Sequence, residues 1–528
     1  MMKKIFHTLS LALLSAGAVL TTSCVGDLDQ LPHIEQTSST VYTSVDNYKA
    51  VLGKLYVSFT IAGQEKGGGK ADLTSNKGWD YMRNYFNMQE CGTDEVVYTW
   101  LAGDNMTGLT YLTWDANDLL VSDMYYRLFY NIALCNEFLR NATDERIASF
   151  SEAEQEEIRH YRAEARFLRA LAYYHAMDLF RNIPFVTEND PVVGYVPPRY
   201  TSAQVFAFVE SELQAIDGDL LDRTACEYGR ACRQAAYALL ARLYLNAEVY
   251  TGEARWTDCI TYCHHVMEAG YELEEDYAKL FNADNHLRTN EIIFAFPVDA
   301  LHTTSWGTTT YLICGAINNA SDTQNPADYG AVSGWGNFRM RGELPSLFSD
   351  GDRRAMFYTE GQTLDIDVVE NQAYGYLSVK WTNLTDDGQA ASNTTSDGAS
   401  TDFPVFRLAD VYLMLAEAVV RGGQGATAAE ALGCVNQVRE RAYGDTSGNI
   451  VEAQMTTDFL LDERARELYT ECVRRTDLIR YNRFTTADYL WQWKGGARDG
   501  QAVDGKFNYY PIPSTELTAN PNLYNEGY

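Results

Sequence analysis

Pairs of amphipathic helices constrain the fold of this chain more than any other feature of its sequence. Ser151 and Glu154 form a capping box, and apolar residues then recur at helical spacing to about Phe180, after which Pro184 ends the helix. Small residues on one helix that meet aromatic residues on the next are typical of tetratricopeptide hairpins, although no strict repeat of about 34 residues is found. The chain is therefore predicted to be mainly α, with tetratricopeptide-like helix pairs forming a compact scaffold and not a solenoid. The paired helices are predicted over residues 230–245 and 256–267, and over residues 405–421 and 428–441.

Two long segments, about residues 60–117 and 285–402, interrupt the helices and show little periodicity. Loops of this length are usually functional or disordered. Six of the nine tryptophans fall in them, which argues against disorder because disordered segments are poor in aromatic residues. We therefore expect the helices to act as scaffold and these loops to form the working surface. The six tryptophans are Trp79, Trp100, Trp114, Trp306, Trp335 and Trp381.

The N-terminus has the pattern of a bacterial lipoprotein signal. Lys3 and Lys4 precede an apolar run over residues 5–20, and small residues lead directly to Cys24. The run is shorter than the roughly 20 residues that cross a bilayer. Residues 1–23 are predicted to be a cleaved signal peptide, and Cys24 is predicted to be the lipidated first residue of the mature protein. The alternative is an ordinary secretory signal that happens to end near a cysteine.

The composition fits a large acidic domain outside the cytoplasm, residues 24–528. The 72 acidic residues outnumber the 42 basic ones and give a formal net charge of −30, which makes nucleic acid an unsuitable partner. Ten cysteines minus Cys24 leave nine, spread from Cys91 to Cys472, so full pairing is impossible. Disulfides are therefore not expected to be the scaffold of the fold.

Several stretches resemble the SusD/RagB family of glycan-binding surface lipoproteins from Bacteroidetes. The resemblance covers essentially all of the chain after Cys24. It implies a mostly helical fold with tetratricopeptide-type pairs, no catalysis and no cofactor. It also implies a lipid anchor that holds the protein at the surface of the outer membrane, beside a partner barrel of the SusC type that depends on TonB. The stretches that resemble the family are residues 163–170, 462–469, 474–480 and 510–513, and those that resemble its starch-binding founder are residues 93–95, 311–315 and 489–496.

The resemblance also implies where a glycan binds. Sugar rings present flat C–H faces edged by hydroxyl groups, so a site needs aromatic platforms and a few hydrogen-bonding groups. The family's asparagine aligns near Gly103, so either Asp104 or Asn105 must replace it, and the family's acidic contact falls near Ser75. Two of the aromatic positions carry a different aromatic type from the founder, which could retune the site to a differently curved glycan. The predicted ligand-binding residues are Arg83, Tyr98, Trp100, Asp104, Asn105, Trp306 and Trp335.

Three other patterns are given structural interpretations. Cys259 and Cys263 stand four residues apart beside two histidines, but this spacing also fits a packed helix, so no metal site is predicted. The glycine run over residues 67–69 lacks the full phosphate-loop pattern and is interpreted as a mobile loop. Asp94 and Glu95 are adjacent, and in an extended segment they would point to opposite faces, unlike a glycosidase pair.

The leading hypothesis is a surface-exposed lipoprotein that captures starch or malto-oligosaccharides and passes them to a SusC-like transporter. Two alternatives stay open at this point. The chain could bind another glycan, such as a β-glucan, a mannan or a host glycan. It could also be a scaffold that covers the transporter and has little affinity for sugar.

Overall fold

The computed structural model describes residues 38–318 and 321–528. The predicted signal peptide, residues 1–23, and the predicted lipidation site Cys24 lie outside the described residues. Both therefore stay predictions.

The chain divides into two units, Met1–Ala50 and Val51–Tyr528. The described part of the first unit contains helix α2 (Ser38–Val41) and the beginning of α3 (Val45–Val57). The remaining elements belong to the second unit.

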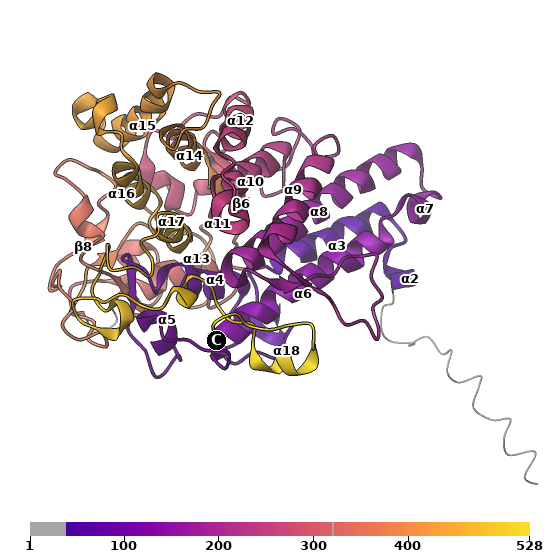
Figure 1. Ribbon diagram of the computed structural model, residues 1–528, viewed down its shortest axis with the longest axis horizontal. Coiled ribbons are helices and arrows are strands. Elements are labelled where there is room, and N and C mark those ends of the chain that lie inside the picture. Colours follow the sequence, from indigo (N-terminus) through magenta and orange to yellow (C-terminus); the bar gives the residue numbers. More distant parts are fainter. Residues whose placement is uncertain (1–37, 319–320) are drawn as a thin grey trace, which may run out of the picture. The chain divides into compact units, whose positions relative to one another are not determined.

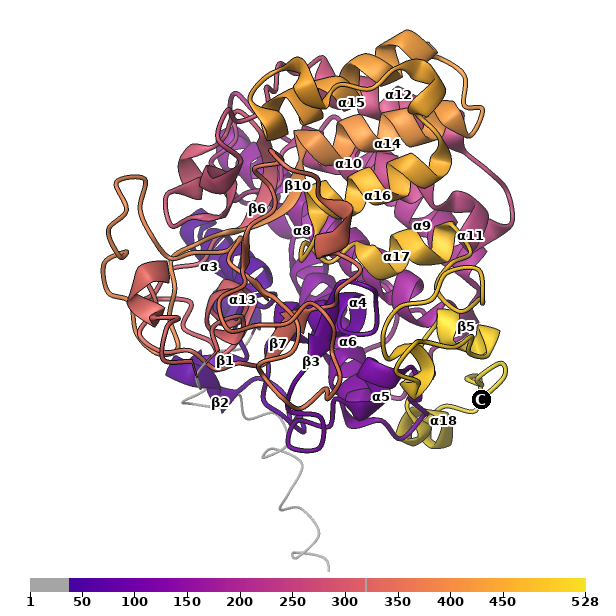
Figure 2. The ribbon, with the colours of Figure 1, turned by 90° about the vertical axis from the view of Figure 1, so that its left-hand side faces the viewer.

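Helices that follow one another along the chain pack against each other in the second unit (Figure 1). Helix α8 packs on α6 and α9, and α14 packs on α12 and α15, while α10 packs on α12. Figure 2 shows the same neighbours from a second direction. The prediction of a mainly helical fold is thus confirmed. The bounds are α6 (Leu119–Asn141), α8 (Glu152–Phe180), α9 (Ser202–Ala215), α10 (Arg233–Leu245), α12 (Trp256–Met267), α14 (Leu408–Val420) and α15 (Ala428–Tyr443).

Helix α8 begins and ends where the sequence predicts. The backbone N–H of Ser151 donates to Glu154 Oε2 at 2.9 Å, and the backbone N–H of Glu154 donates to Ser151 Oγ at 3.5 Å. The helix ends at Phe180 because Arg181 has a φ of 64°, which is outside the helical region. The predicted beginning and the predicted end at about Phe180 are thus confirmed, but Arg181 and not Pro184 ends the helix.

The predicted helix over residues 405–421 is wrong at its beginning. Residues Phe403–Arg407 form strand β10, which pairs antiparallel with β6 (Ile292–Phe296). Helix α14 begins only at Leu408. Tertiary pairing with a segment more than a hundred residues earlier therefore decides the conformation of residues 405–407, and local periodicity does not reveal it.

The two long segments are more ordered than their poor periodicity indicates. Helix α4 (Tyr81–Glu90) lies in the first segment, and all ten of its residues are buried. Half of its residues are polar or charged, so the complete burial of this helix could not be predicted from their types. The glycine run over residues 67–69, interpreted as a mobile loop, lies at the turn of a small hairpin of β1 (Gly63–Glu65) and β2 (Gly69–Ala71).

A short antiparallel ladder connects the two long segments. Strand β3 (Val96–Tyr98) pairs with β7 (Phe338–Met340), so that Tyr98 lies opposite Phe338 (Figure 2). Beyond the ladder, the backbone N–H of Thr99 donates to the carbonyl oxygen of Asn337 at 2.6 Å. Residues about 240 positions apart in the sequence are thereby held side by side.

Arginine and carboxylate side chains form a buried network, called here the ion network. Arg407 binds Glu291, Glu467 and Glu471, and Arg354 binds Glu467 and two further carboxylates. The network includes residues from the family-like stretch 462–469, so this stretch has a structural role. Its members are Arg354, Arg407, Arg439, Arg441, Arg466, Glu291, Asp352, Glu463, Glu467 and Glu471.

Asp94 is also a structural residue. It accepts two hydrogen bonds from the Arg474 guanidinium, at 2.8 and 2.6 Å, and a third from the Tyr489 hydroxyl at 2.6 Å. Burial by itself would raise the pKa of Asp94, but Arg474 outweighs burial and lowers it. Three family-like stretches, around residues 94, 474 and 489, thus meet in the interior.

The other elements are short. The helices are α5 (Thr107–Tyr111), α7 (Asp144–Ile147), α11 (Ala247–Thr251), α13 (Thr308–Gly315), α16 (Thr457–Leu468), α17 (Arg474–Arg480) and α18 (Ser514–Ala519), and the strand pairs are β4 (Ile183–Pro184) with β5 (Arg199–Tyr200) and β8 (Phe357–Tyr358) with β9 (Leu377–Ser378).

Candidate functional site

The β3–β7 ladder places both long segments at one cavity of about 470 Å³, called here the aromatic cavity. Four of the seven residues that the sequence predicts for the ligand site line it, and four further residues complete its wall. The predicted ones are Arg83, Asp104, Trp306 and Trp335, and the others are Lys77, Trp79, Asn337 and Ser396.

Two tryptophans offer ring faces in the aromatic cavity. Trp306 is 55% exposed and lies just before α13, with its indole beside Gly67 of the β1–β2 hairpin. Trp335 is partly exposed, and its indole N–H donates to Ser333 Oγ at 3.3 Å. Indoles that are exposed within a concave site are suited to stacking on the apolar faces of a ligand.

Trp100 lies next to this cavity but does not line it. Its side chain is 44% exposed, and its indole N–H donates to the carbonyl oxygen of Gly336 at 3.1 Å. Trp100 therefore rests on the turn that follows Trp335. The remaining tryptophans of the long segments, Trp114 and Trp381, are buried and pack the core.

Arg83 is fixed between two aromatic rings at the base of the cavity. Its Cζ atom lies 4.0 Å from the ring centroid of Trp79 and 4.2 Å from that of Tyr311. Its Nη1 group donates to the carbonyl oxygen of Trp306 at 2.5 Å. Arg83 is only 5% exposed, so it positions the rings and the backbone of Trp306 and offers little surface of its own.

The Arg83 guanidinium does not pair with Asp80 or Glu90, the carboxylates on either end of α4. The Asp80 carboxylate accepts from the backbone N–H of Arg83 at 2.8 Å, as the N-cap of α4. Within the described part of the chain, no ion pair joins the Arg83 guanidinium to either carboxylate.

Tyr98 supports the cavity from beneath. Its side chain is fully buried, so it presents no ring face to a ligand, in contrast to the stacking role that the resemblance implies. Its hydroxyl donates to Asp104 Oδ2 at 2.6 Å and accepts from Asn337 Nδ2 at 2.9 Å. Burial raises the pKa of Tyr98, which keeps the hydroxyl protonated as a donor. Tyr98 thereby holds the two polar residues of the cavity in place.

Of the two candidates for the family's asparagine, the structure places Asp104 in the cavity wall. Asn105 is exposed, has a φ of 59° and does not line the cavity. Asn337 supplies an amide that the sequence reasoning missed, because its place depends on the long-range pairing of β7 with β3. Its position two residues after Trp335 is the only local signal that could have drawn attention to it.

Lys77 contributes a cation to the same wall. Its Nζ donates to the carbonyl oxygen of Gly103 at 2.7 Å and lies 3.4 Å from Asp104 Oδ1. The Asp123 carboxylate on α6 accepts from the backbone N–H groups of Asn76 and Lys77. A helix of the scaffold therefore fixes the loop that carries Lys77.

Comparison with known proteins identifies the family. The family described as "SusD family" matches residues 354–528, and the one described as "Starch-binding associating with outer membrane" matches residues 28–245. The starch-binding protein SusD of Bacteroides thetaiotaomicron is 32% identical over 579 aligned residues, which cover 100% of this chain and 99% of that protein. The chain belongs to the SusD family.

Solved structures share the fold of this SusD-family chain. A SusD-like carbohydrate binding protein from Bacteroides fragilis has a TM-score of 0.70 at 20% identity and covers 92% of this chain and 100% of its own. Surface glycan-binding protein A from Bacteroides thetaiotaomicron, in complex with laminarihexaose, has a TM-score of 0.69 at 17% identity, with the same coverage.

SusD-family proteins bind carbohydrate and are not enzymes, and this member is a SusD-like glycan-binding protein. The family is associated with the outer membrane. The aromatic cavity agrees with a binding role, since Asp104 is the sole carboxylate among the described residues that line it, whereas a glycosidase uses a pair. Among residues 38–318 and 321–528, no helix is long and apolar enough to span a membrane.

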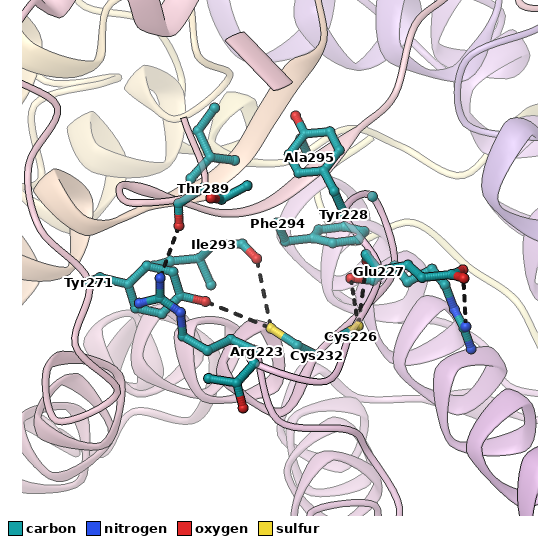
Figure 3. A pocket seen from close by; sticks show the side chains of 14 residues that line it. Arg223, Cys226, Glu227, Tyr228, Cys232, Tyr271, Thr289, Ile293, Phe294 and Ala295 are labelled. Carbon is teal, nitrogen blue, oxygen red and sulfur yellow. Dashed lines mark hydrogen bonds and ion pairs between the residues drawn. The ribbon is translucent and has the colours of Figure 1, made fainter. Parts of the chain in front are cut away.

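A different cavity of the SusD-family chain, of about 300 Å³, lies between the loop before α10 and strand β6 (Figure 3). Arg223 covers the ring of Tyr271, with Cζ 3.8 Å from the centroid, and its guanidinium donates to the carbonyl oxygens of Ala269 and Thr289. Its charged group is thus engaged with the protein itself, and the cavity lacks exposed tryptophans. We assign this cavity no ligand.

The cysteine and histidine pattern on α12 is part of the packing. Cys259 and Cys263 are buried, and His264 Nε2 lies 2.7 Å from Glu430 Oε1 of α15. Within the described residues, no group of three or more histidine, cysteine, aspartate or glutamate side chains is placed to hold a metal ion.

Proposed function

We propose that this SusD-family protein captures starch or malto-oligosaccharides in the aromatic cavity. One observation carries the proposal: Trp306 and Trp335, from separate turns, line a single cavity together with the polar side chains of Asp104 and Asn337. The similarity to a protein named as starch-binding supports the same ligand class.

The chemistry of the cavity suits a neutral polysaccharide. The indoles can stack on the C–H faces of successive sugar rings, while a carboxylate and an amide can accept from and donate to hydroxyl groups. Lys77 and Asp104 are already paired, so the cavity offers hydrogen bonds without a strong net charge.

We further propose that the protein is held at the cell surface by a lipid on Cys24 and passes its ligand to a SusC-like TonB-dependent barrel. The lipoprotein pattern of the N-terminus and the outer-membrane association of the family support this part. Tethering a binder beside a transporter raises the local concentration of ligand at its entrance.

A β-glucan is the second candidate ligand. The observation in its favour is that a protein of the same fold was solved with laminarihexaose. A chain that binds no glycan would instead fit the scaffold hypothesis.

Binding of the purified protein, residues 25–528, to amylopectin and to laminarin tests the proposal. We expect amylopectin to bind, and the double variant Trp306→Ala/Trp335→Ala to lose binding while its melting temperature stays that of the parent. Tyr524→Ala is a matched control, because Tyr524 is 56% exposed but does not line the cavity. Binding of laminarin alone would replace starch by a β-glucan, and binding of neither would favour the scaffold.

The anchor requires a separate experiment. We expect full-length protein to fractionate with membranes and to incorporate labelled palmitate, and the Cys24→Ser variant to do neither. Incorporation of label by the variant would show that Cys24 is not the lipidated residue.

A further inference from the structure

A third cavity, distinct from the aromatic cavity and from the one in Figure 3, lies beside the turn that carries Trp335. It has a volume of about 720 Å³, within the range of about 300 to 1,000 Å³ typical of ligand sites. We call it the amide cavity, because four of its lining residues carry side-chain amides. These are Asn318, Gln362, Asn371 and Gln372.

Gly336 connects the two cavities. It stands between Trp335 and Asn337, which both line the aromatic cavity, and it packs against Gln372 of the amide cavity. A Cβ atom at Gly336 would lie 2.5 Å from Gln372 Oε1, and the φ of 60° also favours glycine. This turn is therefore a wall that the two cavities share.

Trp100 lies on the same wall. Its indole N–H donates to the carbonyl oxygen of Gly336, and its exposed ring belongs to neither cavity lining. An exposed aromatic face at this place offers a stacking surface between the two cavities. Because Trp100 does not line the aromatic cavity, binding in that cavity gives no role to its exposed ring.

The amide cavity has the chemistry of a site for hydroxyl groups. Side-chain amides donate and accept, so they can match both roles of a sugar hydroxyl. The amide of Asn318 bonds Gln362, and that of Gln362 bonds two backbone carbonyl oxygens, so Asn371 and Gln372 are the amides that carry this argument. The cavity is also lined by the carboxylates Asp322, Glu360 and Glu370, which can accept from hydroxyl groups. Gln372 Oε1 is shielded from solvent and, within the described chain, has no hydrogen-bond partner. A buried acceptor without a partner costs free energy that a bound hydroxyl would recover once side chains adjust.

We propose that the amide cavity is an extension subsite, which binds the continuation of a glycan chain that leaves the aromatic cavity over Trp100. This inference rests on the proposed function and adds a preference for longer chains. A longer chain gains contacts in the amide cavity, whereas a short oligosaccharide fills the aromatic cavity alone.

The test is calorimetry with maltotriose and maltoheptaose on the purified protein, residues 25–528. We expect maltoheptaose to bind the parent more tightly, and Gln372→Ala and Asn371→Ala, whose parent residues line only the amide cavity, each to weaken maltoheptaose about fivefold while maltotriose binding stays unchanged. Gln424→Ala is the matched control, since Gln424 lines neither cavity.

The outcomes separate the two proposals. Equal affinity for both sugars in the parent, or an equal loss for both sugars in the two variants, would overturn the extension subsite and leave the aromatic cavity standing. If neither sugar bound the parent protein, the starch proposal would fall and this inference with it. The unchanged maltotriose affinity of the variants also serves as the check that they are folded.

Discussion

Arginine side chains occupy two different surroundings in this protein. In the ion network, Arg407 is surrounded by the carboxylates Glu291, Glu467 and Glu471. At the aromatic cavity, Arg83 lies between two rings and bonds a carbonyl oxygen and a hydroxyl. The buried arginines of the first kind secure the fold, and one of them, Arg466, lies in a stretch that resembles the family. Among the described residues, Arg83 forms no ion pair with the nearby carboxylate of Asp104, which lines the cavity.

The largest expected effect is the loss of stability when the ion network is broken. Arg407→Ala should lower the free energy of unfolding by about 3 to 5 kcal/mol, because it removes one buried counter-ion from each of three buried carboxylates, Glu291, Glu467 and Glu471. Denaturation in urea measures this. Arg498→Ala, whose partner Asp367 is exposed, should change the free energy by less than about 1 kcal/mol. Equal effects of the two substitutions would contradict the distinction between buried and exposed pairs.

The ion network also predicts a loss of stability in acid. Burial would raise the pKa of Glu467, but Arg441, Arg407 and Arg354 outweigh it and lower the pKa from 4.5 to about 2. A carboxylate whose pKa is lower in the folded state stabilises the protein above its unfolded pKa, and this contribution is lost as the pH falls towards the folded one.

We therefore expect the free energy of unfolding to fall by on the order of a few kcal/mol between pH 4.5 and pH 2. Urea titrations at a series of pH values would reveal it. A free energy that stayed constant over this interval would mean that Glu467 is not held ionised by its arginines.

At the aromatic cavity the corresponding substitution should act on binding. Arg83→Ala should weaken glycan binding about tenfold, because Trp79 and the backbone of Trp306 lose the group that positions them. Its effect on the free energy of unfolding should be smaller than that of Arg407→Ala. Calorimetry measures the glycan affinity, and urea denaturation of the same preparation measures the free energy of unfolding. Unchanged affinity would remove Arg83 from the site.

The smallest expected effect concerns a single hydroxyl group. Tyr98→Phe keeps the buried ring but removes the donor to Asp104 and the acceptor for Asn337, so both side chains can move. We expect glycan affinity to fall about threefold to tenfold and the free energy of unfolding to fall by about 1 kcal/mol. If stability fell and affinity did not, the hydroxyl would serve only the fold.

The sequence predicts best those helix and strand bounds that depend on neighbouring residues in the chain. The beginning of α8 follows from the capping box of Ser151 and Glu154. The helix α4 and the strand part of residues 405–407 were not predicted, since half of the residues of α4 are polar although all are buried, and the pairing with β6 leaves no local pattern.

The same limit applies to the candidate site. Trp306 and Trp335 could be proposed from their type and from the family resemblance. That Tyr98 is buried beneath Asp104, and that Asn337 joins the wall, depends on how β3 meets β7. Side-chain direction in a strand changes with every residue, so a resemblance can place a residue at the site without giving its role.

The β3–β7 ladder has a consequence for the order in which the protein forms. A contact between residues about 240 positions apart has to close a long loop, and the entropy of that closure is recovered only when the surrounding contacts exist. The helix pairs depend on neighbours nearby in the chain and can form earlier. Sugar binding would therefore appear late in folding, and its recovery after dilution from denaturant should lag behind the recovery of helical circular dichroism.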